Sequence, residues 1–143
     1  MWEDGELGPD GLHAIALSTS SDGGASWTPP RVVGGSNPVQ RFKPAVAARD
    51  GSVVVSFRSR VPDENRVPMR YVASSDAGAT FGRERKLGRA GDLRFAVTTG
   101  DHLGAVDLRF LGDYMGLAMS ADPAHAVRCR PSPPRSGSGH GSK

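Results

Sequence analysis

The sequence predicts an all-β protein of short strands joined by tight turns, and three observations support this. The chain has 143 residues, of which 19 are Gly and 11 are Pro, a composition that favours frequent turns over long helices. Several short apolar stretches alternate with polar residues at a period of two, as strands do. A turn motif of fixed residue types also occurs twice, which indicates a structural repeat.

The repeated motif reads Ser-x-Asp-x-Gly-x-(Ser/Thr)-aromatic. Residues 20–27 are Ser-Ser-Asp-Gly-Gly-Ala-Ser-Trp, and residues 74–81 are Ser-Ser-Asp-Ala-Gly-Ala-Thr-Phe. The first copy begins at Ser20 and the second at Ser74, so the offset is 54 positions. The blades of β-propellers typically repeat every ~40–50 residues, so this offset predicts one blade per copy with a slightly long loop.

Strand candidates surround both copies of the motif. They cover residues 12–18, 31–33, 44–48, 53–57, 69–73 and 83–87. Asp50-Gly51 lies between two of them and is a strong hairpin signal. Residues 42–87 are therefore expected to form one complete four-stranded blade.

Incomplete units are expected on either side of this blade. Trp2-Glu3-Asp4 resembles the end of a strand, so we expect the chain to start inside a blade. Residues 114–119 and 125–127 are expected to be the first two strands of a third blade. Residues 88–112 hold two similar stretches, 91–95 and 106–110, which are either a small repeat or a coincidence. The prediction is a partial β-propeller of about two and a half four-stranded blades over residues 1–127.

Residues 128–143 are expected to form a disordered tail rich in Arg, Pro, Ser and Gly. From Pro131 onward, every residue except Arg135, His140 and Lys143 is Pro, Ser or Gly. The tail carries four basic residues and no acid, whereas the formal charge of the whole chain is +3. The remaining body is thus close to neutral with mixed signs, which argues against nucleic-acid binding.

Several classes of site and location are not supported by the sequence. Cys129 is the only cysteine, so no internal disulfide or cysteine-rich zinc site is expected. The four histidines have no metal-binding spacing, and no nucleotide or cofactor motif occurs, so we expect no metal and no cofactor. No apolar run approaches the ~20 residues of a membrane span. The N-terminus lacks the apolar segment of a signal peptide, which leaves the localisation open.

Every fixed position of the motif has a local structural task. The glycines allow positive φ, the aspartates and serines bond turn amides, and the aromatic rings are expected to be buried against the blade. These structural residues are Ser20, Asp22, Gly24, Trp27, Ser74, Asp76, Gly78 and Phe81. A catalytic or calcium-binding role for the two aspartates is the alternative.

The paired turns resemble the Asp-box, or bacterial neuraminidase repeat (BNR), family of sialidase-like propellers. The segment 112–118, Gly-Asp-Tyr-Met-Gly-Leu-Ala, is similar to a Gly-Asp-Tyr-x-Gly-Leu segment of secreted bacterial exo-α-sialidase-like proteins. Trp2-Glu3-Asp4 resembles a Trp-x-Asp strand end in their blades. The resemblance implies a glycoside hydrolase of a family that is often extracellular, with the Asp-boxes at the outer rim and away from the substrate.

Sialidase chemistry needs arginines that bind the substrate carboxylate and a tyrosine nucleophile that is activated by a Glu. It also needs an Asp that serves as the general acid and base. The weak candidates for such roles are Asp113, Tyr114, Arg41, Arg58 and Arg60. Arg41 lies in Arg-Phe-Lys-Pro, one residue out of register with the Tyr/Phe-Arg-Ile-Pro motif of the family. The alternative for each candidate is structural. The arginines are then solvated strand residues, and Asp113 and Tyr114 are a turn aspartate followed by a core tyrosine. Glu3 and Asp4 are further candidates at a strand end.

Two alternatives accompany the interpretation as a sialidase-like fragment. The first is a non-catalytic Asp-box propeller that binds protein or glycan. The second is a truncated or misread reading frame without its own function. We expect the chain to be inactive alone, because a site at the axis of a propeller needs residues from blades around the whole ring. Missing blades or self-association would be needed to cover its open edges. The partner expected for the parent propeller is a glycan, namely a sialoside. Nucleic acid and membranes are not expected as partners.

Overall fold

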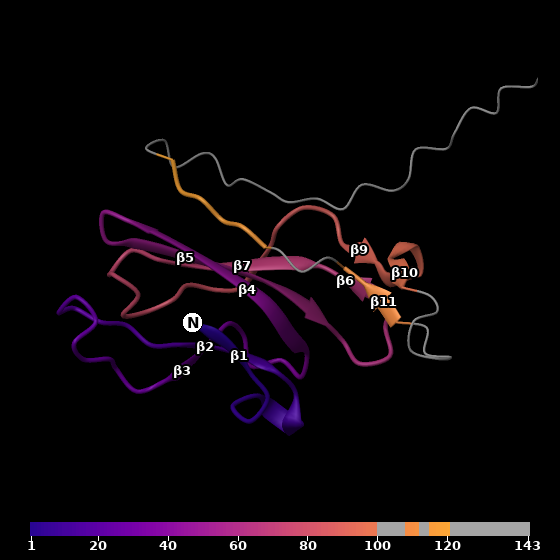
Figure 1. Ribbon diagram of the computed structural model, residues 1–143, viewed down its shortest axis with the longest axis horizontal. Coiled ribbons are helices and arrows are strands. Elements are labelled where there is room, and N and C mark those ends of the chain that lie inside the picture. Colours follow the sequence, from indigo (N-terminus) through magenta and orange to yellow (C-terminus); the bar gives the residue numbers. More distant parts are fainter. Residues whose placement is uncertain (100–107, 112–114, 121–143) are drawn as a thin grey trace, which may run out of the picture.

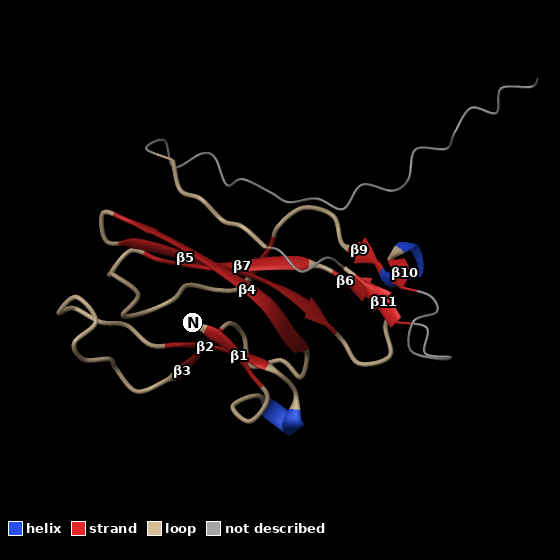
Figure 2. Ribbon diagram, viewed as in Figure 1, coloured by secondary structure: helices blue, strands red, loops and turns tan. Residues whose placement is uncertain are grey.

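The computed structural model describes residues 1–99, 108–111 and 115–120 (Figure 1). These residues form antiparallel sheets and two short 3-10 helices, η1 (Pro9–Gly11) and η2 (Leu93–Phe95), and the described part of the chain contains no α-helix (Figure 2). The prediction of an all-β protein is therefore confirmed.

The largest sheet has four strands, which lie side by side in the order in which they occur along the chain. It consists of β4 (Gln40–Arg49), β5 (Ser52–Arg60), β7 (Met69–Ser74) and β8 (Arg85–Lys86). Each strand pairs antiparallel with the next, as predicted for residues 42–87. Asp50 and Gly51 join β4 to β5 with φ values of 49° and 76°, which a two-residue hairpin with primed-turn geometry requires.

A three-stranded sheet precedes it. Its strands are β1 (Trp2–Asp4), β2 (Ala14–Leu17) and β3 (Arg31–Val33), again neighbours in that order and antiparallel. The expected strand end at Trp2–Asp4 is therefore confirmed. The first turn motif joins β2 to β3, and the second joins β7 to β8.

The repeat found in the sequence is also a repeat of strand register. The pairing of β2 with β3 recurs between β7 and β8, with every partner shifted by the offset that separates the two motifs. The equivalent pairs are Ala16–Val32 with Arg70–Lys86, and Leu17–Arg31 with Tyr71–Arg85. The two sheets are thus copies of one strand–turn–strand unit in three dimensions.

The hydrophobic core lies between the two sheets. Ile15, Leu17 and Val33 from the three-stranded sheet meet Val55, Phe57 and Val72 from the four-stranded sheet. All six side chains are at most 5% exposed. The burial of these aliphatic and aromatic side chains holds the two sheets face to face.

Two small two-stranded ladders lie outside the four-stranded sheet, and the first of them uses the short strand between β5 and β7. β6 (Arg66–Val67) pairs with β9 (Gly91–Asp92), and β10 (Val97–Thr99) pairs with β11 (Leu108–Phe110). The triplet Leu-Arg-Phe is a 3-10 helix at residues 93–95 and a strand at 108–110. The similarity between residues 91–95 and 106–110 is therefore not a structural repeat.

The expected strand over residues 114–119 is not found in the described residues 115–120. Met119 makes a single bridge there and its described neighbours are irregular. A strand persists only where its backbone groups have ladder partners, and one bridge supplies too few. The described residues contain one four-stranded sheet, one three-stranded sheet and two two-stranded ladders, and the count of two and a half blades stays a prediction. The segment 125–127 and the tail 128–143 lie outside the described residues.

Candidate functional site

The second turn motif is held by hydrogen bonds among its own residues. The Ser74 hydroxyl donates to Asp76 Oδ1 at 2.6 Å and accepts from the Gly78 amide at 2.9 Å. Asp76 Oδ1 accepts from the Thr80 amide at 2.8 Å, while Oδ2 accepts from the Thr80 hydroxyl at 2.6 Å. Both carboxylate oxygens therefore serve the turn itself.

The first motif repeats this pattern bond for bond. The Ser20 hydroxyl donates to Asp22 Oδ1 at 2.7 Å and accepts from the Gly24 amide at 2.8 Å. Asp22 accepts from the Ser26 amide at 2.9 Å and from its hydroxyl at 2.5 Å. Gly24 has a φ of 95°, as the motif requires of its glycine. The same local sequence thus produces the same closed turn twice.

These bonds lower the pKa of both aspartates far below the usual range. The Ser26 hydroxyl contributes most at Asp22, and the Ser74 hydroxyl contributes most at Asp76. A carboxylate that stays ionised and has both oxygens occupied is a poor general acid or base. Across the described part of the chain, no group of three or more His, Cys, Asp or Glu side chains could hold a metal ion. The geometry supports the structural role expected for the motif.

The aromatic rings of the two motifs have different surroundings. Phe81 packs against the core, and the Arg31 guanidinium lies 5.4 Å from the centroid of its ring. Trp27 is 63% exposed, and its ring nitrogen donates to the Gly24 carbonyl at 3.1 Å. The prediction that both rings are buried is therefore wrong for Trp27. The two motifs differ in their neighbours. The second motif lies against the three-stranded sheet, whereas no described residue covers the Trp27 ring as much as the core covers Phe81.

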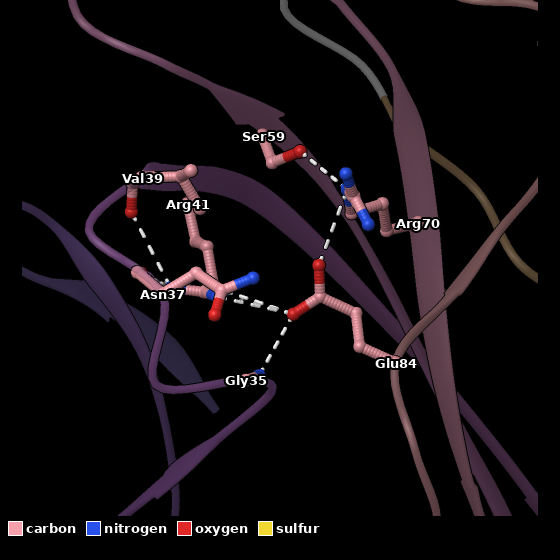
Figure 3. A network of polar contacts seen from close by, with 7 residues as sticks. All are labelled: Gly35, Asn37, Val39, Arg41, Ser59, Arg70 and Glu84. Atoms are coloured by element: carbon pink, nitrogen blue, oxygen red, sulfur yellow. Dashed lines mark hydrogen bonds and ion pairs between the residues drawn. The ribbon is translucent and has the colours of Figure 1, made fainter.

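Arg41, the first of the catalytic candidates, belongs to a buried ion network (Figure 3). Its side chain is 1% exposed, and its Nη2 lies 3.1 Å from Glu84 Oε2. Its Nη1 donates to the carbonyls of Asn37 and Val39. On the other side of Glu84, Arg70 Nε lies 3.2 Å from Oε1 and donates to the Ser59 hydroxyl at 2.9 Å.

Glu84 ties together segments that are far apart in sequence. It immediately precedes β8, and its Oε2 also accepts from the Gly35 amide at 2.7 Å in the link between β3 and β4. A Cβ atom at Gly34 would lie 3.1 Å from Arg41 Nε, and its φ is 112°, so only glycine suits this close approach. The described geometry gives Arg41 a role in joining elements and leaves it almost no surface for a substrate.

Arg58 and Arg60 lie on one face of β5, as the alternation predicts. Arg60 Nε donates to the Glu64 carbonyl oxygen at 2.7 Å, and no ion pair joins either arginine to the carboxylates of Asp63 or Glu64 within the described residues. Arg58 is only 4% exposed, and its Nε has no hydrogen-bond partner there. Burial lowers the pKa of Arg58. The expected solvated basic face is thus wrong for Arg58.

The candidate arginines do not converge. Arg41 pairs with Ser59, and Phe42 pairs with Arg58, so Arg41 and Arg58 lie on opposite faces of the four-stranded sheet. Asp113 and Tyr114 lie outside the described residues. Sequence analysis did not single out Glu84 or Arg70. Nothing in the local sequence shows that a charged residue in or beside a strand takes part in a long-range ion pair.

Glu3 and Asp4, the remaining candidates, hold local structure. Asp4 Oδ2 accepts from the Trp2 ring nitrogen at 2.9 Å, and Oδ1 accepts from the amides of Glu6 and Leu7. The bond from Trp2 contributes most to lowering the pKa of Asp4. Glu3 Oε1 lies 2.5 Å from His13 Nδ1. Both carboxylates are therefore engaged by neighbouring groups.

No family model, curated protein or solved structure is significantly similar to this chain. In the part that the structure describes, no helix has the length and apolar character needed to cross a bilayer. Proposals on function therefore depend on the residues and their geometry.

Proposed function

We propose that this chain is a section of a sialidase-type β-propeller, of the glycoside hydrolase kind, that does not turn over substrate by itself. The observation that carries the proposal is the repeat of strand register and of turn hydrogen bonds between the first motif and the second. Propellers are built from such blades, each packed face to face against the next. The two stacked sheets fit that architecture, and the sequence Gly-Asp-Tyr at 112–114, outside the described residues, supports the resemblance to the family.

The lack of turnover follows from the positions of the arginines. A substrate carboxylate needs guanidinium groups that converge on an accessible site. Arg41 is buried against Glu84, and Arg58 lies on the opposite face of the sheet. Arg41 and Arg58 therefore cannot grip the carboxylate of one sialoside together.

A fluorogenic sialoside assay on the purified full chain tests the proposal, with an active sialidase as the positive control. We expect hydrolysis no faster than in buffer, because the carboxylate-binding cluster is not assembled. Turnover that disappears in Arg60→Ala, which removes the partly exposed candidate arginine, would contradict it. A glycan array on the same sample separates the alternatives: glycan binding without turnover indicates a non-catalytic binding propeller.

A further inference from the structure

The two sheets stack through unlike faces. Ile15 and Leu17 of the three-stranded sheet point into the core. Their counterparts in the second unit, Met69 and Tyr71, point away from it, because Val72, which follows Tyr71 and lies on the opposite face of the strand, is a core residue. The interface is therefore heterologous: one face of the first unit meets the other face of the second.

In the described part of the chain, the outer face of the three-stranded sheet is partly exposed where its counterpart is covered. Trp2 pairs with Ala16, which pairs with Val32, so the three share the face that points away from the core. Trp2 is 37% exposed and Val32 is 43% exposed, whereas Ala16 between them is fully buried. The counterpart of Ala16 is Arg70, whose strand partner Phe57 is fully buried against the first unit. We call this side, with Trp2, Asp4, Ala16 and Val32, the head face.

The opposite end of the stack is also incompletely covered. Leu17 is 5% exposed because the second unit packs on it, whereas its counterpart Tyr71 is half-buried and Ala73 beside it is exposed. Tyr71 pairs with Ser56 in β5 and with Arg85 in β8, so these side chains lie on one face, where Ser56 is fully buried and Arg85 is exposed. We call this side, with Ser56, Tyr71, Ala73 and Arg85, the tail face.

All of the head face except Val32 belongs to an acidic segment, and the tail face belongs to a basic segment. Residues 1–30 contain five Asp or Glu and no Lys or Arg, whereas residues 31–99 contain 13 Lys or Arg and six Asp or Glu. Asp4 lies on the head face, and the exposed Arg85 lies on the tail face. The head face and the tail face are thus complementary in charge. They also correspond to the two faces that meet between the sheets within the chain.

We propose that the head face of one copy of this chain binds the tail face of a second copy, which continues the stacking already present between its two sheets. The inference depends on this stacking and not on the sialidase assignment. A heterologous contact propagates, so the product is a closed ring or an open chain of copies.

Sedimentation velocity on the full chain over a concentration series tests the proposal. We expect reversible association that weakens as salt is raised, because the charges of the two faces are then screened. Trp2→Lys blocks the head, and Ala73→Glu blocks the tail. Each substitution is expected to raise the dissociation constant at least about tenfold, since it places a charge that opposes contact on one of the two faces.

Mixing the two variants identifies the heterologous geometry. Each blocked variant alone is expected to be monomeric, whereas an equimolar mixture forms a heterodimer and nothing larger, because one compatible pair of faces remains. Pairing of two head faces would leave Ala73→Glu able to associate, and this result would overturn the proposal. A wild-type chain that stays monomeric up to about 1 mM would also overturn it.

Val32→Lys provides a second head variant if Trp2→Lys does not fold, with circular dichroism as the check on folding. Its matched control is Val61→Lys, because Val61 is 42% exposed and lies in the loop between β5 and β6. The control is expected to associate like the wild type. Equal loss of association in Val32→Lys and Val61→Lys would show that the head face is not the contact.

Discussion

Ala77 occupies a backbone position that favours glycine. Its φ is 56°, whereas the equivalent residue of the first turn motif is Gly23 with a φ of 71°. A Cβ atom costs about 1–2 kcal/mol in this left-handed region, while glycine costs about 0.5–1 kcal/mol through its freedom in the unfolded chain. The two copies of the motif thus contain a natural substitution pair at one position.

Exchanging these two residues is expected to change stability in opposite directions. Ala77→Gly should raise the free energy of unfolding by about 0.5–1 kcal/mol, and Gly23→Ala should lower it by a similar amount. A Cβ atom at Gly23 meets no atom within 4 Å, so the effect there is conformational and not steric. Urea unfolding followed by circular dichroism measures both. A loss of stability in Ala77→Gly would contradict the argument.

At the scale of elements, Glu84 joins three segments, which are the link after β3, strand β4 and strand β7. Its side chain is 10% exposed and meets the 1% exposed Arg41. Removing one partner of a buried ion pair leaves the other charge without compensation. The network is therefore expected to be strongly coupled to folding.

Glu84→Gln is expected to lower the free energy of unfolding by about 3 kcal/mol, because Arg41 then keeps a buried charge without a carboxylate. Glu64→Gln, in the loop after β5, is the matched control and should stay within about 0.5 kcal/mol of the wild type. Chemical denaturation of both variants measures the difference. Similar values for the two would show that the network adds little to stability.

The elements differ in how far sequence could predict them. The turn motifs, the Asp50-Gly51 hairpin and the four strands follow from local patterns, and the structure has them where they were expected. The Arg41–Glu84 contact joins residues from distant parts of the chain, and nothing local marks it. The strand expected at 114–119 and the burial of Trp27 failed for a related reason, since each depends on a neighbouring element and not on its own sequence.

At the scale of the whole molecule, the stack of two units formed by the described residues has an incompletely covered face at each end. One repeat interface is formed inside the chain, and it buries the apolar side chains of both sheets. The head and tail faces are the same two surfaces without their partners. Association of copies would therefore bury apolar surface that a single copy leaves in water.

The acid stability of the molecule is expected to follow the two turn motifs. The folded-state pKa values of Asp22 and Asp76 are lowered by the hydroxyl and amide bonds of their turns, relative to about 3.9 in an unfolded chain. Groups whose pKa is depressed on folding stabilise the native state above the unfolded pKa, and that stabilisation is lost as the pH falls toward the folded value. Asp92, whose pKa Arg94 lowers to about 2, acts in the same direction.

We therefore expect the free energy of unfolding to be level above about pH 5 and to fall progressively below about pH 4. The double variant Asp22→Asn/Asp76→Asn should be less stable at neutral pH and should show a shallower decrease in acid. Asp63→Asn removes an exposed carboxylate outside both motifs and should keep the wild-type slope. Urea unfolding at a series of pH values measures the three curves. Parallel curves for the double variant and the wild type would mean that the turn aspartates do not govern the acid response, since an amide at these positions cannot titrate.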